Sequence, residues 1–251
     1  MRADQLLVER GLAATRSQAQ RLIAAGVRWR MGQQTWSPID KNGAVLPEGC
    51  ELLLLDDAET RFVSRGGLKL EGALQQTGLS PQGLVCLDVG QSTGGFTDCL
   101  LQHGAARVWG VDVGHGQLHP QVRADTRVHV MERVNAREMT PALFGAQGAM
   151  GFDLVVADLS FISLTLVLPA IATVMKPQAS ALLLIKPQFE LQAQDLGKGG
   201  VVKNPALYSQ VEQRLRQACQ TVNLDVVAWL LSPITGGDGN QEFFIHARRA
   251  A

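Results

Sequence analysis

Cysteine is scarce and long hydrophobic runs are absent in this sequence of 251 residues. The four cysteines form no CxxC pair, which argues against a zinc site and against a disulfide framework. The most hydrophobic stretches, residues 52–55 and 181–185, are far shorter than the roughly 20 apolar residues that span a bilayer. No signal peptide opens the chain. We therefore expect a cytoplasmic protein with no membrane partner and no metal site.

Net charge is lacking too, because 23 basic residues balance 23 acidic ones. The charges are unevenly distributed, however: residues 1–30 hold six arginines and two acids, whereas residues 31–60 hold one lysine and six acids. This asymmetry predicts a basic face that tracks phosphates. The alternative is that the arginines lie on ordinary solvated helix faces. The candidate contacts to RNA are Arg2, Arg10, Arg16, Arg21, Arg28 and Arg65.

The first sixty residues predict a small α+β domain that begins with two helices. Asp4 is expected to cap a short helix, and Gly11 is expected to end it in the left-handed conformation. Thr15 or Ser17 would cap a second helix, which Gly26 ends.

Three short strands should complete this domain. Val27–Arg30 and Gln33–Trp36 would form a hairpin around a two-residue turn at Met31-Gly32, and Glu51–Leu55 would add a third strand. The expected boundaries are a first domain at residues 1–58, a linker at 59–64 and a larger domain at 65–251.

An alternation of strands and helices begins at Val85 and predicts an α/β domain with a mostly parallel sheet covered on both faces. A helix is expected over about residues 205–222. The two strands after it are joined by a loop too short for a crossover helix, so they should pair antiparallel. Seven strands ending in such a hairpin are typical of the Rossmann-like methyltransferase sheet. The expected strands are Val85–Val89, Arg107–Val111, Val128–Met131, Leu154–Ala157, Ala181–Ile185, Val226–Leu231 and Glu242–Ala247.

A glycine-rich segment, residues 88–97, follows the first of these strands, and we call it the glycine turn. Three residues separate Gly90 from Gly94, unlike the GxGxxG dinucleotide pattern, which favours a ligand with an amino-acid tail and no pyrophosphate. Asp112 ends the second strand, where a carboxylate can accept both hydroxyls of a ribose. The alternative is a plain tight turn. The candidate cofactor-binding residues are Asp88, Gly90, Ser92, Thr93, Gly94, Gly95, Phe96, Asp112, Val113, Asn135 and Asp158.

Asn135 has two interpretations. It follows the third strand, where it could contact the adenine of a cofactor, and capping a helix there is nearly as good an explanation.

Seven motifs stand in order along the chain: Arg65–Leu70, Asp88–Thr97, Asp112–Leu118, Asp158–Leu164, Lys186–Glu190, Gly199–Val202 and Glu242–Phe244. Together they resemble the TlyA (hemolysin A-like) family. The resemblance implies an N-terminal RNA-binding fold like that of ribosomal protein S4, joined to an FtsJ-like methyltransferase domain. It also implies S-adenosylmethionine as the cofactor, ribosomal RNA or ribosomal subunits as the partner, and methylation of a cytidine 2′-hydroxyl.

The same resemblance assigns catalysis to Lys69, Asp158, Lys186 and Glu242. The residues alone support two of these, because Asp158 and Lys186 lie just beyond the carboxyl ends of expected strands, the edge where α/β sheets bind ligands. Lys186 would hydrogen-bond the 2′-oxygen and take its proton when the amine is neutral, while the two carboxylates orient the lysines. The alternative is that these four residues form surface ion pairs on unrelated elements.

Other functions are compatible with parts of the pattern. An RNA-binding protein or a cytolysin with an inactive methyltransferase fold is the main alternative. Amino-group methylation is disfavoured because Asp158 is followed by no Pro-Pro pair. Family members with short termini are associated with large-subunit RNA. Because this chain ends four residues after Ala247, we expect the large subunit as substrate.

Overall fold

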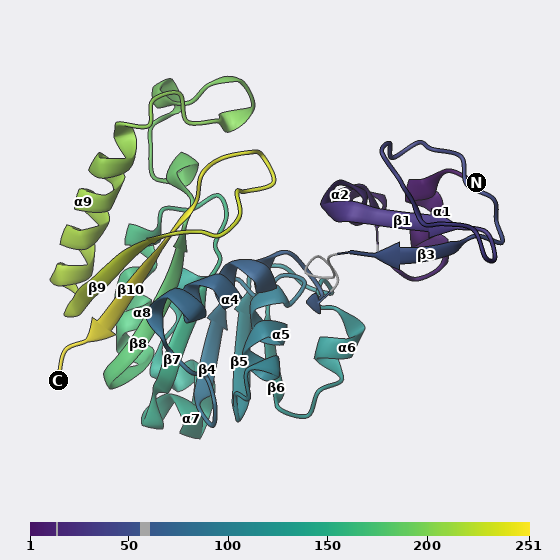
Figure 1. Ribbon diagram of the computed structural model, residues 1–251. Coiled ribbons are helices and arrows are strands. Elements are labelled where there is room, and N and C mark those ends of the chain that lie inside the picture. Colours follow the sequence, from purple (N-terminus) through teal and green to yellow (C-terminus); the bar gives the residue numbers. More distant parts are fainter. Residues whose placement is uncertain (14, 56–60) are drawn as a thin grey trace. The chain divides into compact units, whose positions relative to one another are not determined.

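A computed structural model of the chain describes residues 1–13, 15–55 and 61–251. The chain divides into two compact units, Met1–Arg65 and Gly66–Ala251, and each is described by itself (Figure 1). The expected domain boundary at residue 58 and the first part of the expected linker at 59–64 lie outside the described residues.

The first unit begins with the two expected helices, α1 (Ala3–Glu9) and α2 (Arg16–Gly26). Thr15 caps α2 as predicted, because its side-chain oxygen accepts a hydrogen bond from the backbone N–H of Gln18. Gly11 takes the left-handed conformation expected after the first helix, with φ +69°. Local chemistry therefore defines where α2 begins and how the chain turns after α1.

The expected cap at Asp4 is wrong. The helix α1 begins after Arg2, and Asp4 lies in its first turn, fully buried. Its carboxylate is paired with the guanidinium groups of Arg2 (3.0 Å) and Arg16 (2.9 Å). These partners lower the pKa of Asp4 well below its usual range, despite the opposing effect of burial. Tertiary ion pairing therefore replaces the local role that the sequence suggested.

A three-stranded antiparallel sheet completes the first unit, with β1 (Val27–Arg30) between β2 (Ser37–Pro38) and β3 (Glu51–Leu54). The expected hairpin arm at Gln33–Trp36 is wrong, because β1 pairs instead with Ser37–Pro38 across a wider loop. A two-residue type I′ turn needs positive φ at both central residues. Of Met31 and Gly32, only Gly32 adopts it, with φ +52°.

The second unit contains a seven-stranded sheet in the order β6-β5-β4-β7-β8-β10-β9. The strands β4 to β8 are parallel to one another, and β10 runs antiparallel to both β8 and β9. This confirms the expected fold class and its closing hairpin. The strands are β4 (Val85–Val89), β5 (Arg107–Asp112), β6 (Val128–Glu132), β7 (Phe152–Ala157), β8 (Met175–Ile185), β9 (Leu224–Leu231) and β10 (Phe243–Arg249).

Helices cover both faces of this sheet (Figure 1). On one face α4 and α5 contact each other, and Thr97 of α5 reaches Asp88 in β4. Alternate residues of β4, Leu87 and Val89, point the other way into a core that includes Ile171 of α8 and Leu215 of α9. The α-helices are α4 (Gly66–Thr77), α5 (Gly95–Gln102), α6 (Pro120–Arg123), α7 (Gly145–Met150), α8 (Leu168–Val174) and α9 (Leu207–Thr221).

Short 3-10 helices occupy the connections between these elements. They are η1 (Ala136–Glu138), η2 (Pro141–Phe144), η3 (Leu164–Leu166), η4 (Pro187–Phe189), η5 (Ala193–Asp195) and η6 (Lys198–Gly200). Within the described ranges, no helix combines the length and the apolar character needed to cross a membrane.

Candidate active site

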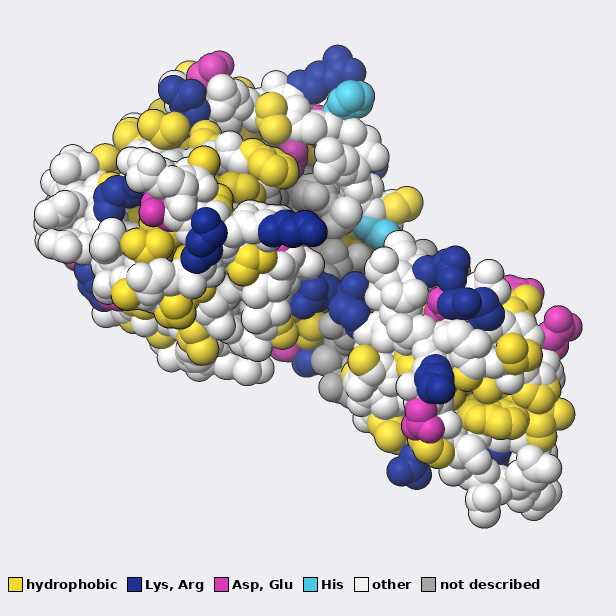
Figure 2. Space-filling model, turned by 90° about the horizontal axis from the view of Figure 1, so that it is seen from above, with side chains coloured by type: hydrophobic (Ala, Val, Ile, Leu, Met, Phe, Trp, Pro, Cys, Tyr) yellow, Lys and Arg dark blue, Asp and Glu magenta, His cyan; other side chains and the backbone are white. Residues whose placement is uncertain are grey.

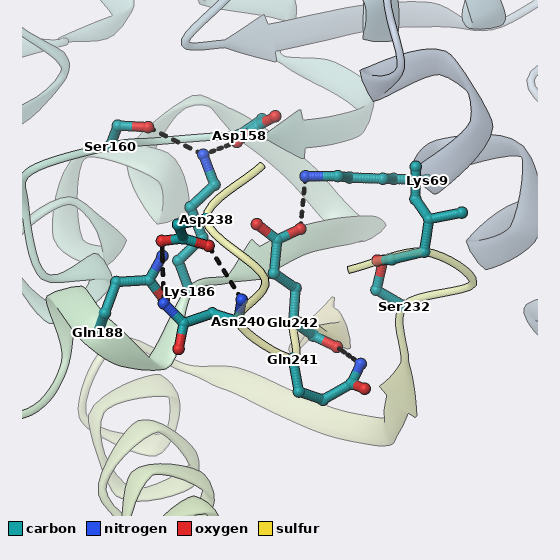
Figure 3. A network of polar contacts seen from close by, with 11 residues as sticks. Lys69, Asp158, Ser160, Lys186, Gln188, Ser232, Asp238, Asn240, Gln241 and Glu242 are labelled. Atoms are coloured by element: carbon teal, nitrogen blue, oxygen red, sulfur yellow. Dashed lines mark hydrogen bonds and ion pairs between the residues drawn. The ribbon is translucent and has the colours of Figure 1, made fainter. Parts of the chain in front are cut away.

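The four predicted catalytic residues come together at the carboxyl edge of the parallel strands (Figure 3). Asp158 directly follows β7 and Lys186 directly follows β8. Glu242 directly precedes β10, and because β10 is antiparallel to β8, its first residues lie at the same edge. Lys69 extends from α4. Residues far apart in the sequence therefore share one edge because of the sheet topology.

Two lysine–carboxylate ion pairs form there. The first joins Lys69 Nζ to Glu242 Oε2 at 2.5 Å, and its side chains are only 9% and 2% exposed. The second joins Lys186 Nζ to Asp158 Oδ1 at 2.5 Å, with side chains 13% and 23% exposed. Lys186 also donates a hydrogen bond to Ser160 Oγ at 2.9 Å. The Lys186 pair is thus the more accessible of the two, while the Lys69 pair is buried.

The two pairs are close enough to influence each other. Burial raises the pKa of Glu242, and the ammonium of Lys69 is the main opposing influence. The charges of Asp158 and Lys186 also act on the pKa of Glu242, in opposite directions. The four groups therefore form one electrostatic unit of two positive and two negative charges.

The loop after β7 contributes two residues that the sequence analysis did not predict for the site. Ser160 accepts the hydrogen bond from Lys186. Phe161 is 91% exposed, and it adopts φ +63°, which is rare for a bulky residue. Its ring lies 5.1 Å from the ring of Phe189. The available signal was their position, since both follow Asp158 within three residues.

The glycine turn lies against the same loop. Gly90 has φ +86°, and a Cβ atom there would be 2.4 Å from the backbone oxygen of Asp158. Gly94 has φ +94°, and its Cβ would be 2.7 Å from Leu118 Cδ1. Any side chain at either position would collide with a neighbour, so the glycines are required by the close approach as well as by the backbone conformation.

Asp112 ties the glycine turn to the end of β5. Its Oδ2 accepts a hydrogen bond from Ser92 N and its Oδ1 accepts one from Gly114 N, each at 2.7 Å. A carboxylate oxygen can accept more than one hydrogen bond, so both oxygens keep capacity for a ligand. Ser92 and Thr93 are exposed in the turn, and Val113 is exposed beside it.

Asp88 lies beneath the turn and is fully buried. Thr97 Oγ1 donates a hydrogen bond to its Oδ2 at 2.7 Å, and Gln91 Nε2 in turn donates to Thr97 Oγ1 at 2.9 Å. Burial raises the pKa of Asp88 to about 7, although the Thr97 hydrogen bond opposes this. Phe96 is also buried and stacks on Phe244, with ring centroids 6.1 Å apart. These two side chains therefore support the turn from the inside.

Asn135 acts as a helix cap, the second of its two interpretations. Its Oδ1 accepts a hydrogen bond from Arg137 N at the start of η1, and its Nδ2 donates to Glu138 Oε1 at 3.0 Å. A contact between Asn135 and a cofactor adenine stays a prediction.

Arg2, Arg10 and Arg16 are among the predicted RNA-binding arginines that make contacts within the first unit, as does Arg21, which donates a hydrogen bond to the backbone oxygen of Ser17. Arg2 and Arg16 flank Asp4 with side chains 46% and 54% exposed, so both remain accessible. Arg10 donates hydrogen bonds to the backbone oxygens of Glu48 and Cys50.

The other three arginines differ in exposure. Arg28 is exposed, whereas Arg21 is partly buried, as is Arg65 just before α4. On the face of the larger unit seen in Figure 2, lysine and arginine side chains are more prominent than acidic ones.

The described residues contain no group of three or more His, Cys, Asp or Glu side chains placed to hold a metal ion.

Comparison with known proteins adds a second kind of evidence, because it shows which proteins this chain is similar to. The FtsJ-like methyltransferase family matches residues 62–249. YqxC of Bacillus subtilis (strain 168), which carries a provisional rRNA methyltransferase name, is 44% identical over 98% of this chain and 84% of its own length. The 16S/23S rRNA (cytidine-2'-O)-methyltransferase TlyA of Mycobacterium tuberculosis is 43% identical over 98% of this chain and 89% of its own. A Streptococcus thermophilus structure with a provisional hemolysin name has a TM-score of 0.75 at 38% identity, covering 100% of this chain and 88% of that chain.

Proposed function

Because the chain belongs to the TlyA family of FtsJ-like methyltransferases, we propose that it methylates a cytidine 2′-hydroxyl of ribosomal RNA with S-adenosylmethionine as donor. The observation that carries this proposal is the double ion pair of Lys69, Asp158, Lys186 and Glu242 at the carboxyl edge of the sheet. Relatives with this activity in their names match the chain over nearly its full length.

The glycine turn supports the choice of donor. Close packing at Gly90 and Gly94 leaves the backbone bare, as a cradle for a ligand requires. Asp112 keeps acceptor capacity for the two hydroxyls of a ribose, and exposed Val113 lies next to it for an adenine ring. S-adenosylmethionine supplies a methyl group activated by a sulfonium. The turn and the Lys186 pair adjoin each other, because Gly90 touches the backbone of Asp158.

The chemistry left to the protein is to place the acceptor hydroxyl and manage its proton. Lys186 would hydrogen-bond the ribose 2′-oxygen and, when its amine is neutral, take the proton that this oxygen loses as it bonds to the methyl carbon. Asp158 and Ser160 hold the Lys186 amine in place. The buried Lys69–Glu242 pair would set the electrostatic environment of the Lys186 amine.

Two further features suit an RNA substrate. Phe161 presents an exposed ring directly after Ser160, the residue that accepts a hydrogen bond from Lys186, and we infer that this ring would stack on the base of the target nucleotide. We assign RNA binding to the first unit, with an S4-like role, on the basis of its accessible arginines Arg2 and Arg16.

The direct test is methyl transfer from labelled S-adenosylmethionine to purified large and small ribosomal subunits, followed by digestion and mass spectrometry. We expect 2′-O-methylcytidine in ribosomal RNA from at least one subunit. A methyl group on a base, or no transfer to either subunit by folded protein that binds the donor, would contradict the proposal.

Replacing Lys186 with alanine tests the central assignment. We expect turnover to fall by about a hundredfold or more, the usual contribution of a group that handles a proton in the transition state. Donor affinity, measured by calorimetry, should not change, because Lys186 serves the acceptor. The matched control is Lys198→Ala, which removes an exposed lysine from η6 and should leave turnover intact. Near-normal turnover of Lys186→Ala would remove this lysine from the chemistry.

A further inference from the structure

Glu190 is a buried carboxylate outside the four catalytic residues. It follows η4, four positions after Lys186, and is only 5% exposed. A buried carboxylate is costly unless it is paired and hydrogen-bonded, so its partners show what it holds together.

Those partners lie on two other elements. Glu190 Oε2 accepts a hydrogen bond from Ser163 Oγ at 2.7 Å, and Glu190 Oε1 accepts one from Leu164 N at 2.6 Å. Arg214 of α9 forms an ion pair with Oε2 from the side that faces solvent. One side chain therefore joins the end of the loop after β7, the turn after β8, and α9.

The loop after β7 is thus fixed at both ends. At its start, Asp158 N donates to Val89 O at 3.0 Å, and at its end Ser163 is held by Glu190. Between these points the loop carries Ser160 and Phe161, and φ +63° at Phe161 bends the chain sharply.

The two segments meet at successive positions along their lengths. Asp158 pairs with Lys186, Phe161 contacts Phe189, and Ser163 bonds to Glu190. Of these three contacts, the one at Glu190 lies farthest along both segments from the Asp158–Lys186 pair, and its carboxylate is the most buried. We infer that this contact defines how the two segments are aligned.

We propose that Glu190 is a positioning residue that locks the loop 158–163 against the segment 186–190 and so aligns Asp158 and Ser160 on the Lys186 amine. This inference rests on the proposed function of that amine. Glu190 acts through the two segments, because its own carboxylate is buried and fully engaged.

The chemistry of the side chain suggests a sharp substitution. Glu190→Gln keeps the volume but replaces one acceptor oxygen with an NH2 group, which cannot accept from Leu164 N or Arg214 and can pair with Ser163 only when that hydroxyl accepts. Depending on how the amide is oriented, the contact with Leu164 N or the contact with Arg214 must therefore be lost. Ser163→Ala removes the hydroxyl arm, together with the cap that Ser163 Oγ provides for Thr165 N at the start of η3, and leaves the backbone arm at Leu164.

The helix α9, which holds Arg214, also provides a matched control. Glu212 pairs with Arg216 one turn apart in α9, at 2.8 Å. Glu212→Gln therefore breaks a carboxylate–arginine pair of the same kind without touching either catalytic segment. All variants are full-length and are compared at equal folded concentration.

Single-turnover methylation of ribosomal subunits should separate alignment from simple stability. For Glu190→Gln we expect the rate to fall about ten- to hundredfold, the scale expected for a misplacement near 1 Å. The pH dependence of this rate should also shift, because the contacts of the Lys186 amine change. Donor affinity should stay at the wild-type value, and Ser163→Ala should show a smaller loss of the same kind. Glu212→Gln should match wild type in all three measurements.

An unchanged rate in both Glu190→Gln and Ser163→Ala would overturn the proposal. It would also be overturned if the rate fell only in proportion to donor binding and thermal stability, with the pH profile unmoved. Should Glu190→Gln fail to fold, Ser163→Ala alone decides the matter by the same criteria.

A readout independent of activity separates this proposal from the proposed function. The NMR signal of the Lys186 ammonium, assigned with Lys186→Ala, should move in Ser163→Ala and Glu190→Gln but not in Glu212→Gln. If the wild-type protein transfers no methyl group yet this signal moves, the proposed function fails while the alignment stands. If it does not move, the alignment role is wrong whatever the activity.

Discussion

Asp112 organises the glycine turn in the structure, and in the proposed function it also accepts hydrogen bonds from the donor. Asp112→Ala should weaken S-adenosylmethionine binding by roughly ten- to a hundredfold or more, because each hydrogen bond to a charged group contributes about 1.5–3 kcal/mol. Calorimetry on the folded variant measures this. Asp225→Ala, which changes an exposed aspartate in β9, is the control and should bind normally. Equal affinity of the two variants would exclude Asp112 from the site.

We expect Asp88 to make donor binding depend on pH. Because burial raises its pKa to about 7, Asp88 is largely protonated at pH 6 and largely ionised at pH 8. The donor carries positive charge, which favours the ionised carboxylate, so binding below pH 7 should release a proton. Affinity should therefore rise by up to about fivefold from pH 6 to pH 7 and by up to about tenfold from pH 6 to pH 8, and then level off.

Calorimetry at pH 6, 7 and 8 checks this linkage, with Asp88→Asn as the comparison. The asparagine cannot ionise, so any pH dependence that remains belongs to other groups, such as the amino group of the donor. A wild-type pH dependence no steeper than that of Asp88→Asn would rule out the linkage.

At the scale of elements, the close approach of two loops explains why Gly90 is a glycine. Gly90→Ala would place its Cβ atom 2.4 Å from the backbone oxygen of Asp158, so the glycine turn or the loop after β7 must move. We expect both donor affinity and methylation rate to fall together.

Gly83→Ala provides the control for this change. Gly83 also has positive φ, at +74°, but a Cβ atom there meets nothing within 4 Å. Gly83→Ala should therefore cost only about 1 kcal/mol of folding stability through backbone strain and leave donor binding unaffected. If both variants bound the donor equally well, steric contact with the Asp158 loop would not explain the glycine.

The elements that sequence reasoning predicted well are those with a local signal. Strands with continuous apolar runs, such as β4 and β7, were predicted to within two residues of their ends. The strand β8 begins at Met175 rather than Ala181, because exposed residues in its first part hide the hydrophobic pattern. The hairpin error has a different origin, since Met31-Gly32 supplies only one of the two positive φ values that a tight turn requires.

Non-local contacts were beyond what the residues alone could give. The pairing of Lys69 with Glu242 joins residues far apart in the sequence, and it entered through family resemblance. Neither Ser160 nor Glu190 was predicted, because each depends on which two loops the sheet topology places side by side. Asp4 shows the converse, where a local cap was expected and a buried ion-pair partner was found.

At the scale of the whole molecule, we expect catalysis and RNA binding to be divided between the two units. The second unit holds the glycine turn and all four residues proposed for catalysis, and the family match starts at residue 62. The first unit holds the arginines assigned to RNA, including Arg2 and Arg16, which Asp4 holds in place. Catalysis and substrate capture should therefore be separable by truncation.

A chain beginning at Arg61 should fold and bind S-adenosylmethionine with normal affinity, because every residue of the glycine turn is retained. It should lose most methylation of ribosomal subunits, because five of the six arginines assigned to RNA, all except Arg65, are gone. Full-length binding should weaken steeply with salt, with a log–log slope of about 0.7 to 0.9 per phosphate contact, and the truncated chain should show a shallower slope. Filter binding over a salt series and methylation assays on both chains test this. Because donor binding is measured on the same samples, a loss of methylation by the truncated chain could not be attributed to misfolding, and equal methylation by the two chains would refute the role given to the first unit.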